Sequence, residues 1–119
     1  MSTERVFLNS NPYQIESLWA LTESFPVLQI PTNLLLPTLY VPYWTEAGCP
    51  ISAMDLLRRP SISPMHMTLI NECDLEFPII LAASNLDVLD GLHRICKSIM
   101  LGRVKVSARF VGIRELRRF

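Results

Sequence analysis

The stretch LDVLDGLHRICKSIMLGRVKVSARFV, residues 86–111, contains the pattern that decides the fold. A short apolar run ends at Asp90 and Gly91. Apolar residues then recur at spacings of three and four as far as Gly102, which is typical of a helix buried on one side. Gly102 suits a helix end, and residues 104–111 alternate between apolar and polar as a half-buried strand does. The stretch therefore predicts a strand, a tight turn, a helix over residues 91–101 and a second strand.

A compact apolar run, residues 77–83, lies directly upstream. Ser84 and Asn85 separate it from the strand predicted over residues 86–89, and both residue types are common in turns. We expect the two runs to pair as a β-hairpin. The carboxyl-terminal half of the chain thus predicts a sheet with a helix packed on it.

Local signals in the first two thirds of the chain are weaker. Asn11 as a cap, with Pro12 at the first helical position, predicts a helix that ends near Ser24. Ser52 followed three residues later by Asp55 is the pattern of a capping box and predicts a short helix. The other elements expected here are a strand over 27–30, a helical turn over 32–36, an ordered loop with aromatic anchors over 39–50 and a helix over 64–72.

Length and composition limit the fold class. The chain has 119 residues, half of them hydrophobic, which is enough for one domain with a real core. No apolar run approaches the roughly 20 residues of a membrane span, and the amino terminus lacks the basic start and apolar stretch of a signal peptide. We expect one α/β (α+β) domain over residues 1–119, a small mixed sheet with packed helices, in the cytoplasm and not in a membrane.

Cysteines and histidines give no metal-binding pattern. Cys49, Cys73 and Cys96 are separated by 24 and 23 residues, which matches no zinc motif. We expect three reduced thiols, at least two of them in the core. The chain has two histidines, so we expect no metal site, and His66 is expected to be structural or exposed.

Charge is distributed unevenly although the formal net charge is zero. Residues 1–90 contain three basic and ten acidic side chains, whereas residues 91–119 contain eight basic and one acidic. This asymmetry predicts a basic strip that contacts a protein or a nucleic acid; the alternative is that the two halves of the chain pair with each other. The strip comprises Arg103, Lys105, Arg109, Arg114, Arg117 and Arg118.

Residues 90–94 combine features that favour an anion. Asp90 can cap the predicted helix, and Gly91 lets the backbone approach a ligand closely. The helix dipole and first-turn amides attract negative charge, while His93 and Arg94 offer side-chain donors. The alternative is a purely structural turn whose aspartate caps the helix and whose histidine and arginine are solvated. The predicted phosphate-binding residues are Gly91, Leu92, His93, Arg94 and Lys97.

Residues 77–111 resemble the ParB/sulfiredoxin-like superfamily. The resemblance rests on Pro78 and Ile79 opening an apolar strand, on the sequence VLDGLHR at residues 88–94, and on Leu101 and Gly102 closing the helix. It implies that the turn and helix start bind nucleotide phosphates. By the same resemblance, the ligand is ATP, ADP or CTP with Mg²⁺, or a phosphorylated small molecule.

This chain departs from that superfamily in two ways, and each departure excludes one of the activities found in it. Sulfiredoxins have a catalytic cysteine where this chain has Leu92, so sulfinic-acid reduction is not expected. Partition proteins place the motif beside a helical DNA-binding domain, for which 119 residues leave no room. The resemblance then implies a phosphotransferase or phosphohydrolase acting on a small molecule or nucleic acid.

Catalysis would need a carboxylate to activate the acceptor and another for Mg²⁺. Asp90, Glu46 and His93 are the catalytic candidates, Asp90 on condition that capping does not occupy its carboxylate. Glu72, Asp74 and Glu76 are further candidates for the base. The alternative is a non-catalytic interaction module that binds a protein or a nucleic acid, as an inhibitor or immunity factor does.

Overall fold

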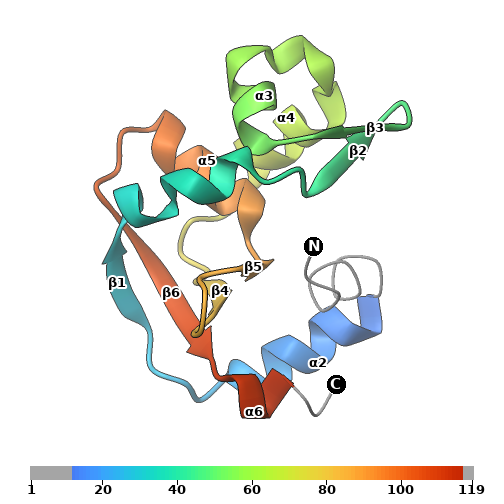
Figure 1. The fold of residues 1–119 in the computed structure, drawn as a ribbon. Coiled ribbons are helices and arrows are strands. Elements are labelled where there is room, and N and C mark those ends of the chain that lie inside the picture. Colours follow the sequence, from blue (N-terminus) through green and yellow to red (C-terminus); the bar gives the residue numbers. More distant parts are fainter. Residues whose placement is uncertain (1–11, 117–119) are drawn as a thin grey trace.

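A computed structural model describes residues 12–116 of the protein (Figure 1). The predicted cap Asn11 lies outside the described residues, as do Arg117 and Arg118 of the basic strip. In chain order the elements are α2 (Pro12–Thr22), β1 (Leu28–Pro31), the 3₁₀ helix η1 (Thr32–Tyr40), β2 (Trp44–Glu46), β3 (Cys49–Ile51), α3 (Ala53–Arg58), the 3₁₀ helix η2 (Pro60–Ile62), α4 (Pro64–Glu72), β4 (Ile79–Ala82), β5 (Val88–Asp90), α5 (Leu92–Met100), β6 (Lys105–Val111) and α6 (Ile113–Leu116).

Four strands form a mixed sheet in the order β1-β6-β4-β5. β4 and β5 pair antiparallel, which confirms the predicted hairpin, and β1 is antiparallel to β6. β4 and β6 run parallel, with Ile80 opposite Arg109, and the chain between them passes through β5 and α5. The structure thereby confirms the predicted small mixed sheet with packed helices.

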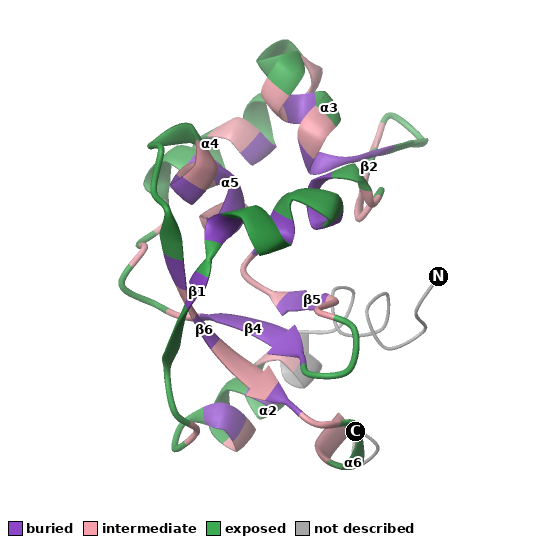
Figure 2. Cartoon of the chain, turned by 60° about the vertical axis from the view of Figure 1, so that its left-hand side comes forward, coloured by how far each residue is buried: buried purple, intermediate pink, exposed green. Residues whose placement is uncertain are grey.

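Helices cover both faces of this sheet. In Figure 1, α2 and α6 lie on one side of the sheet, and η1, α3, α4 and α5 lie on the other. β4 is buried along its whole length because it faces both layers (Figure 2). The core under α5 includes Leu35, Leu56, Ile79, Leu81, Ile95 and Ala108, and the smaller core under α2 comprises Leu18, Ile80, Ala82, Leu89 and Val111.

Local capping fixes the ends of several helices. The Ser52 hydroxyl accepts from the Asp55 amide at 3.1 Å, and the Asp55 carboxylate accepts from the Ser52 amide at 2.9 Å, which confirms the capping box. Gly102 follows α5 with a φ of +70°, a conformation that favours glycine. These short-range signals explain why the predicted positions of α3 and α5 agree with the structure.

The region predicted as a loop over residues 39–50 is corrected by the structure. β2 and β3 form a two-stranded hairpin, and Ala47 and Gly48 at its turn have φ values of +51° and +81°. Two consecutive positive φ values are typical of the turn that matches the twist of paired strands. Alanine is unusual in that conformation, so the usual hairpin signal is missing from the sequence at this point.

The cysteines are all free thiols, as expected. Cys96 is buried, whereas Cys73 is half-buried and Cys49 is exposed at the hairpin. The expectation of at least two cysteines in the core is therefore wrong. Cys49 is exposed because it directly follows the turn of the hairpin formed by β2 and β3.

The described helices are short, and the longest, α2, has 11 residues. Within residues 12–116 no helix has both the length and the apolar character that crossing a membrane requires.

Candidate functional site

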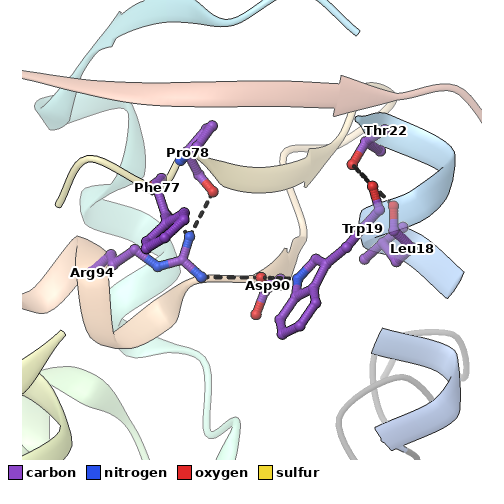
Figure 3. Close-up of polar contacts among 7 residues, drawn as sticks. All are labelled: Leu18, Trp19, Thr22, Phe77, Pro78, Asp90 and Arg94. Carbon is purple, nitrogen blue, oxygen red and sulfur yellow. Dashed lines mark hydrogen bonds and ion pairs between the residues drawn. The ribbon is translucent and has the colours of Figure 1, made fainter. Parts of the chain in front are cut away.

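Asp90 does not cap α5. The N-cap of that helix is Gly91, and no side chain of the described residues caps its first turn. The Asp90 carboxylate instead accepts a hydrogen bond from the Trp19 indole at 2.8 Å and another from the Arg94 guanidinium at 3.1 Å (Figure 3). Asp90 is the last residue of β5, so its side chain is directed toward α2. The capping role predicted for it is thus replaced by a bond to a residue 71 positions away.

Arg94 is held by backbone oxygens as well as by Asp90. Its guanidinium donates to the carbonyl of Pro78 at 2.6 Å and to that of Phe77 at 3.3 Å (Figure 3). Both oxygens belong to the chain just before β4. Arg94, which was predicted to bind phosphate, therefore connects α5 to the start of β4, and Asp90 balances its charge.

Gly91 is required by packing. Its φ is +107°, and a Cβ atom there would lie 2.6 Å from Cγ2 of Ile79 on β4. The predicted close approach thus exists, but its partner is the neighbouring strand. Leu92, the next residue, is buried in the core under α5, so only its backbone is available to a ligand.

Lys97 is directed away from the first turn of α5. Its ammonium group donates to the carbonyls of Asn71 at 2.9 Å and Cys73 at 2.7 Å. These carbonyls lie at the carboxyl-terminal end of α4, where a cation also complements the helix dipole. Lys97 therefore joins α5 to α4 and does not extend the patch predicted around residues 91–94.

His93 belongs to an aromatic cluster. Its Nε2 lies 2.9 Å from Nδ1 of His66 on α4, and the Trp44 ring stacks on both imidazoles at centroid distances of 4.9 and 4.2 Å. Burial, and then the neighbouring His66, lowers the pKa of His93 to about 4. Burial also lowers the pKa of His66, and the negative charge of Glu46 on β2 opposes that effect. His93 is therefore neutral at pH 7 and contacts groups that the sequence did not connect with it.

Two clefts border the predicted motif. The smaller, which we call the motif cleft, has a volume of about 220 Å³ and is lined by Ile15, Tyr43, Trp44, Val88, Asp90, Gly91, Leu92 and His93. The larger, which we call the α2 cleft, has a volume of about 620 Å³ and is lined by Trp19, Ala20, Glu23, Cys73, Asp74, Phe77, Pro78, Ile80, Asp90, Arg94 and Arg109.

Five of the predicted site residues, those at positions 90–94, are divided between these clefts. His93 lines the motif cleft and Arg94 lines the α2 cleft, with Asp90 at the border of both. Glu46 lines neither cleft. The structure thus brings Asp90 and Arg94 together, and it places His93 with Trp44 and His66 on another side of α5.

Arg109 was predicted as a member of the exposed basic strip, and the structure places it at a cleft instead. It lies on β6 opposite Ile80, on the sheet face that α2 partly covers, and it lines the α2 cleft. Its Nε atom is buried and has no hydrogen-bond acceptor among the described residues. Arg109 is thereby withdrawn from the predicted basic strip, whose members Arg103 and Lys105 are exposed. An alternating strand normally turns its polar side chains to solvent, which is why the sequence suggested a surface role.

Metal binding has no support among the residues that the structure describes. Within residues 12–116, no three histidine, cysteine or acidic side chains gather in a way that could hold a metal ion.

Comparisons of the chain with protein-family models, with curated proteins and with solved structures found no match. The ParB/sulfiredoxin-like resemblance therefore rests on the motif residues within 77–111 alone.

Proposed function

We propose that this protein is a ligand-binding module whose α2 cleft holds a small molecule with an apolar body and one anionic group. The buried Nε of Arg109, which has no acceptor in the described part of the chain, is the observation that carries the proposal. A buried donor without an acceptor costs about 1–3 kcal/mol. Once the Arg109 side chain turns this donor into the cleft, a ligand carboxylate or phosphate oxygen would accept from it and remove that cost.

The walls of the α2 cleft fit such a molecule. Five of the lining residues are apolar or aromatic: Trp19, Ala20, Phe77, Pro78 and Ile80. The volume of about 620 Å³ lies within the range of small-molecule sites. Because Asp90 already balances Arg94, Arg109 is the guanidinium available to a ligand anion.

Nuclear magnetic resonance tests this proposal directly. The Nε–H signal of Arg109 would be followed while the protein is titrated with octanoate, and separately with octanamide. We expect octanoate to shift this signal and octanamide to bind at least about tenfold more weakly, because a charged acceptor strengthens the bond to a guanidinium.

Two variants make the same experiment specific. Arg109→Met keeps an apolar stem in the cleft and is expected to abolish octanoate binding. Arg103→Met removes an exposed arginine outside the cleft and is expected to leave binding unchanged. Equal binding of octanoate and octanamide, or octanoate binding that survives Arg109→Met, would refute the proposal.

A second candidate function is nucleotide binding at the motif cleft. The first turn of α5 has no side-chain cap among the described residues, and it borders a cleft that also contains the Trp44 ring. Free amides at a helix start favour phosphate, and an indole can stack on a base. ATP, ADP or CTP with Mg²⁺ would place a phosphate at the amides of residues 92–94.

Backbone amide signals separate this candidate from the first. Titration with each nucleotide and Mg²⁺ is expected to shift the amides of Leu92 and His93 while the Arg109 side chain stays unchanged. Absence of binding at millimolar nucleotide would exclude the candidate. Phosphorus resonance on the same samples tests phosphoryl transfer, which has less support because Asp90 is engaged by two donors and Glu46 lies outside the cleft.

A cytoplasmic location is part of the proposal. All three cysteines are free thiols, and free thiols persist in a reducing compartment.

A further inference from the structure

Two exposed aromatic side chains border the α2 cleft. Trp19 is 50% exposed and Phe77 is 65% exposed, and they approach the cleft from α2 and from the segment before β4. Figure 3 shows Phe77 beside Arg94 and Trp19 beside Asp90. Rings left this exposed beside a cleft retain apolar surface that a ligand can cover.

Hydrogen bonds connect the Trp19 side chain and the Phe77 backbone to the same ion pair. The indole nitrogen of Trp19 is engaged by Asp90, which is engaged in turn by Arg94. Arg94 also binds the backbone carbonyl of Phe77. The network thus links the two aromatic residues and satisfies the polar edge of the indole. What Trp19 offers a ligand is its apolar ring surface.

The charges around the cleft limit how much negative charge a ligand can carry. Two guanidinium groups and three carboxylates line it, and the Asp90 carboxylate is paired with Arg94. The other carboxylates, on Glu23 and Asp74, are exposed. Because like charges repel, these carboxylates oppose a ligand with two or more negative charges, while Arg109 favours one.

We infer that the ligand of the α2 cleft is a planar aromatic monocarboxylate, with its carboxylate on Arg109 and its ring against Trp19 and Phe77. This inference rests on the proposed function, because it also needs Arg109 to receive the anion. It adds two properties of the ligand that the protein selects, an aromatic ring and a single negative charge.

Fluorescence of Trp19 provides the readout. The chain has two tryptophans, so Trp44→Phe leaves Trp19 as the sole indole. This variant would be titrated with trans-cinnamate, with 3-cyclohexylpropanoate as its saturated analogue, with cinnamamide and with phenyl phosphate. We expect cinnamate to bind at least about fivefold more tightly than the saturated acid, since aromatic stacking adds to apolar contact. Cinnamamide and the phosphate dianion are expected to bind more weakly than cinnamate.

Variants of the two rings complete the test, with binding measured by calorimetry in the otherwise natural chain. Phe77→Leu breaks no side-chain hydrogen bond and is expected to remove the preference for cinnamate over the saturated acid; Trp19→Leu is expected to do the same. Tyr40→Leu is the matched control, because Tyr40 is a 57% exposed ring outside the cleft.

The outcomes distinguish this inference from the proposed function. Equal binding of cinnamate and its saturated analogue, with both lost in Arg109→Met, would overturn the inference and leave the proposed function standing. Tighter binding of phenyl phosphate than of cinnamate would overturn the single-charge requirement. If neither acid binds at millimolar concentration and the Arg109 signal does not move, both proposals fail.

Discussion

Arg94 and Asp90 form an ion pair one helical turn apart, with the guanidinium 3.1 Å from the carboxylate and both side chains less than one-fifth exposed. Arg94, predicted to bind an anion, and Asp90, predicted as a helix cap and catalytic candidate, therefore neutralise each other. The Asp90 carboxylate also accepts a hydrogen bond from the indole of Trp19, so the ion pair connects α2 to the end of β5.

Asp90→Ala is expected to destabilise the fold by about 2 kcal/mol. The substitution removes two hydrogen bonds and leaves the largely buried guanidinium of Arg94 without the carboxylate that pairs with it. Urea unfolding gives this value. Glu72→Ala, which removes an exposed carboxylate at the end of α4, serves as the control and is expected to change stability by less than about 0.5 kcal/mol. Equal effects of the two substitutions would contradict the structural role of Asp90.

Gly91→Ala is expected to destabilise by about 2–4 kcal/mol, since it combines a positive φ with a clash against Ile79. Gly48→Ala is the matched control. Gly48 has a φ of +81°, but no atom lies within 4 Å of the position that a Cβ would take, so strain alone should cost about 1–2 kcal/mol. Thermal unfolding of both variants separates the clash from the strain. A smaller loss in Gly91→Ala than in Gly48→Ala would show that the contact with Ile79 is not tight.

Arg109→Met is expected to stabilise the unliganded protein while it abolishes anion binding. Removing a buried donor that has no acceptor is worth about 1 kcal/mol, or about 4 °C in melting temperature for a domain of this size. Differential scanning calorimetry of the natural chain and the variant checks this, with Arg103→Met expected to change neither stability nor binding. A lower melting temperature for Arg109→Met would mean that the guanidinium is already satisfied.

Stability is expected to fall as the solution is acidified below pH 6.5. The His93 ring binds a proton near pH 6.5 in the unfolded chain but only near its lowered pKa of about 4 in the fold. Protons therefore favour the unfolded state between these values. The loss attributable to His93 is about 1 kcal/mol between pH 7 and pH 5, after allowance for solvent around the partly exposed ring.

Urea unfolding at both pH values, in the natural chain and in His93→Gln, isolates this effect. Glutamine keeps hydrogen-bonding capacity but does not titrate, so the variant is expected to lose less stability on acidification. The difference between the two proteins gives the contribution of His93 together with its effect on the neighbouring His66. The same pH dependence in the two proteins would rule out a contribution from His93.

Short-range patterns account for the elements that were predicted correctly. The spacing of apolar residues in α5, the capping box at Ser52 and the glycine after α5 all act between residues a few positions apart. The hairpin of β2 and β3 was missed because Ala47 is not a residue that signals such a turn.

The sequence by itself determined the α+β class and the strand–turn–helix–strand unit of residues 86–111, because periodicity and capping are properties of neighbouring residues. Only the tertiary structure decided what the motif residues contact. Asp90 meets Trp19 from α2, and His93 meets His66 from α4, over separations of 71 and 27 residues. The packing of whole helices and strands sets these contacts. The same packing places Arg109 in the α2 cleft, whereas the sequence predicted it on the exposed basic strip.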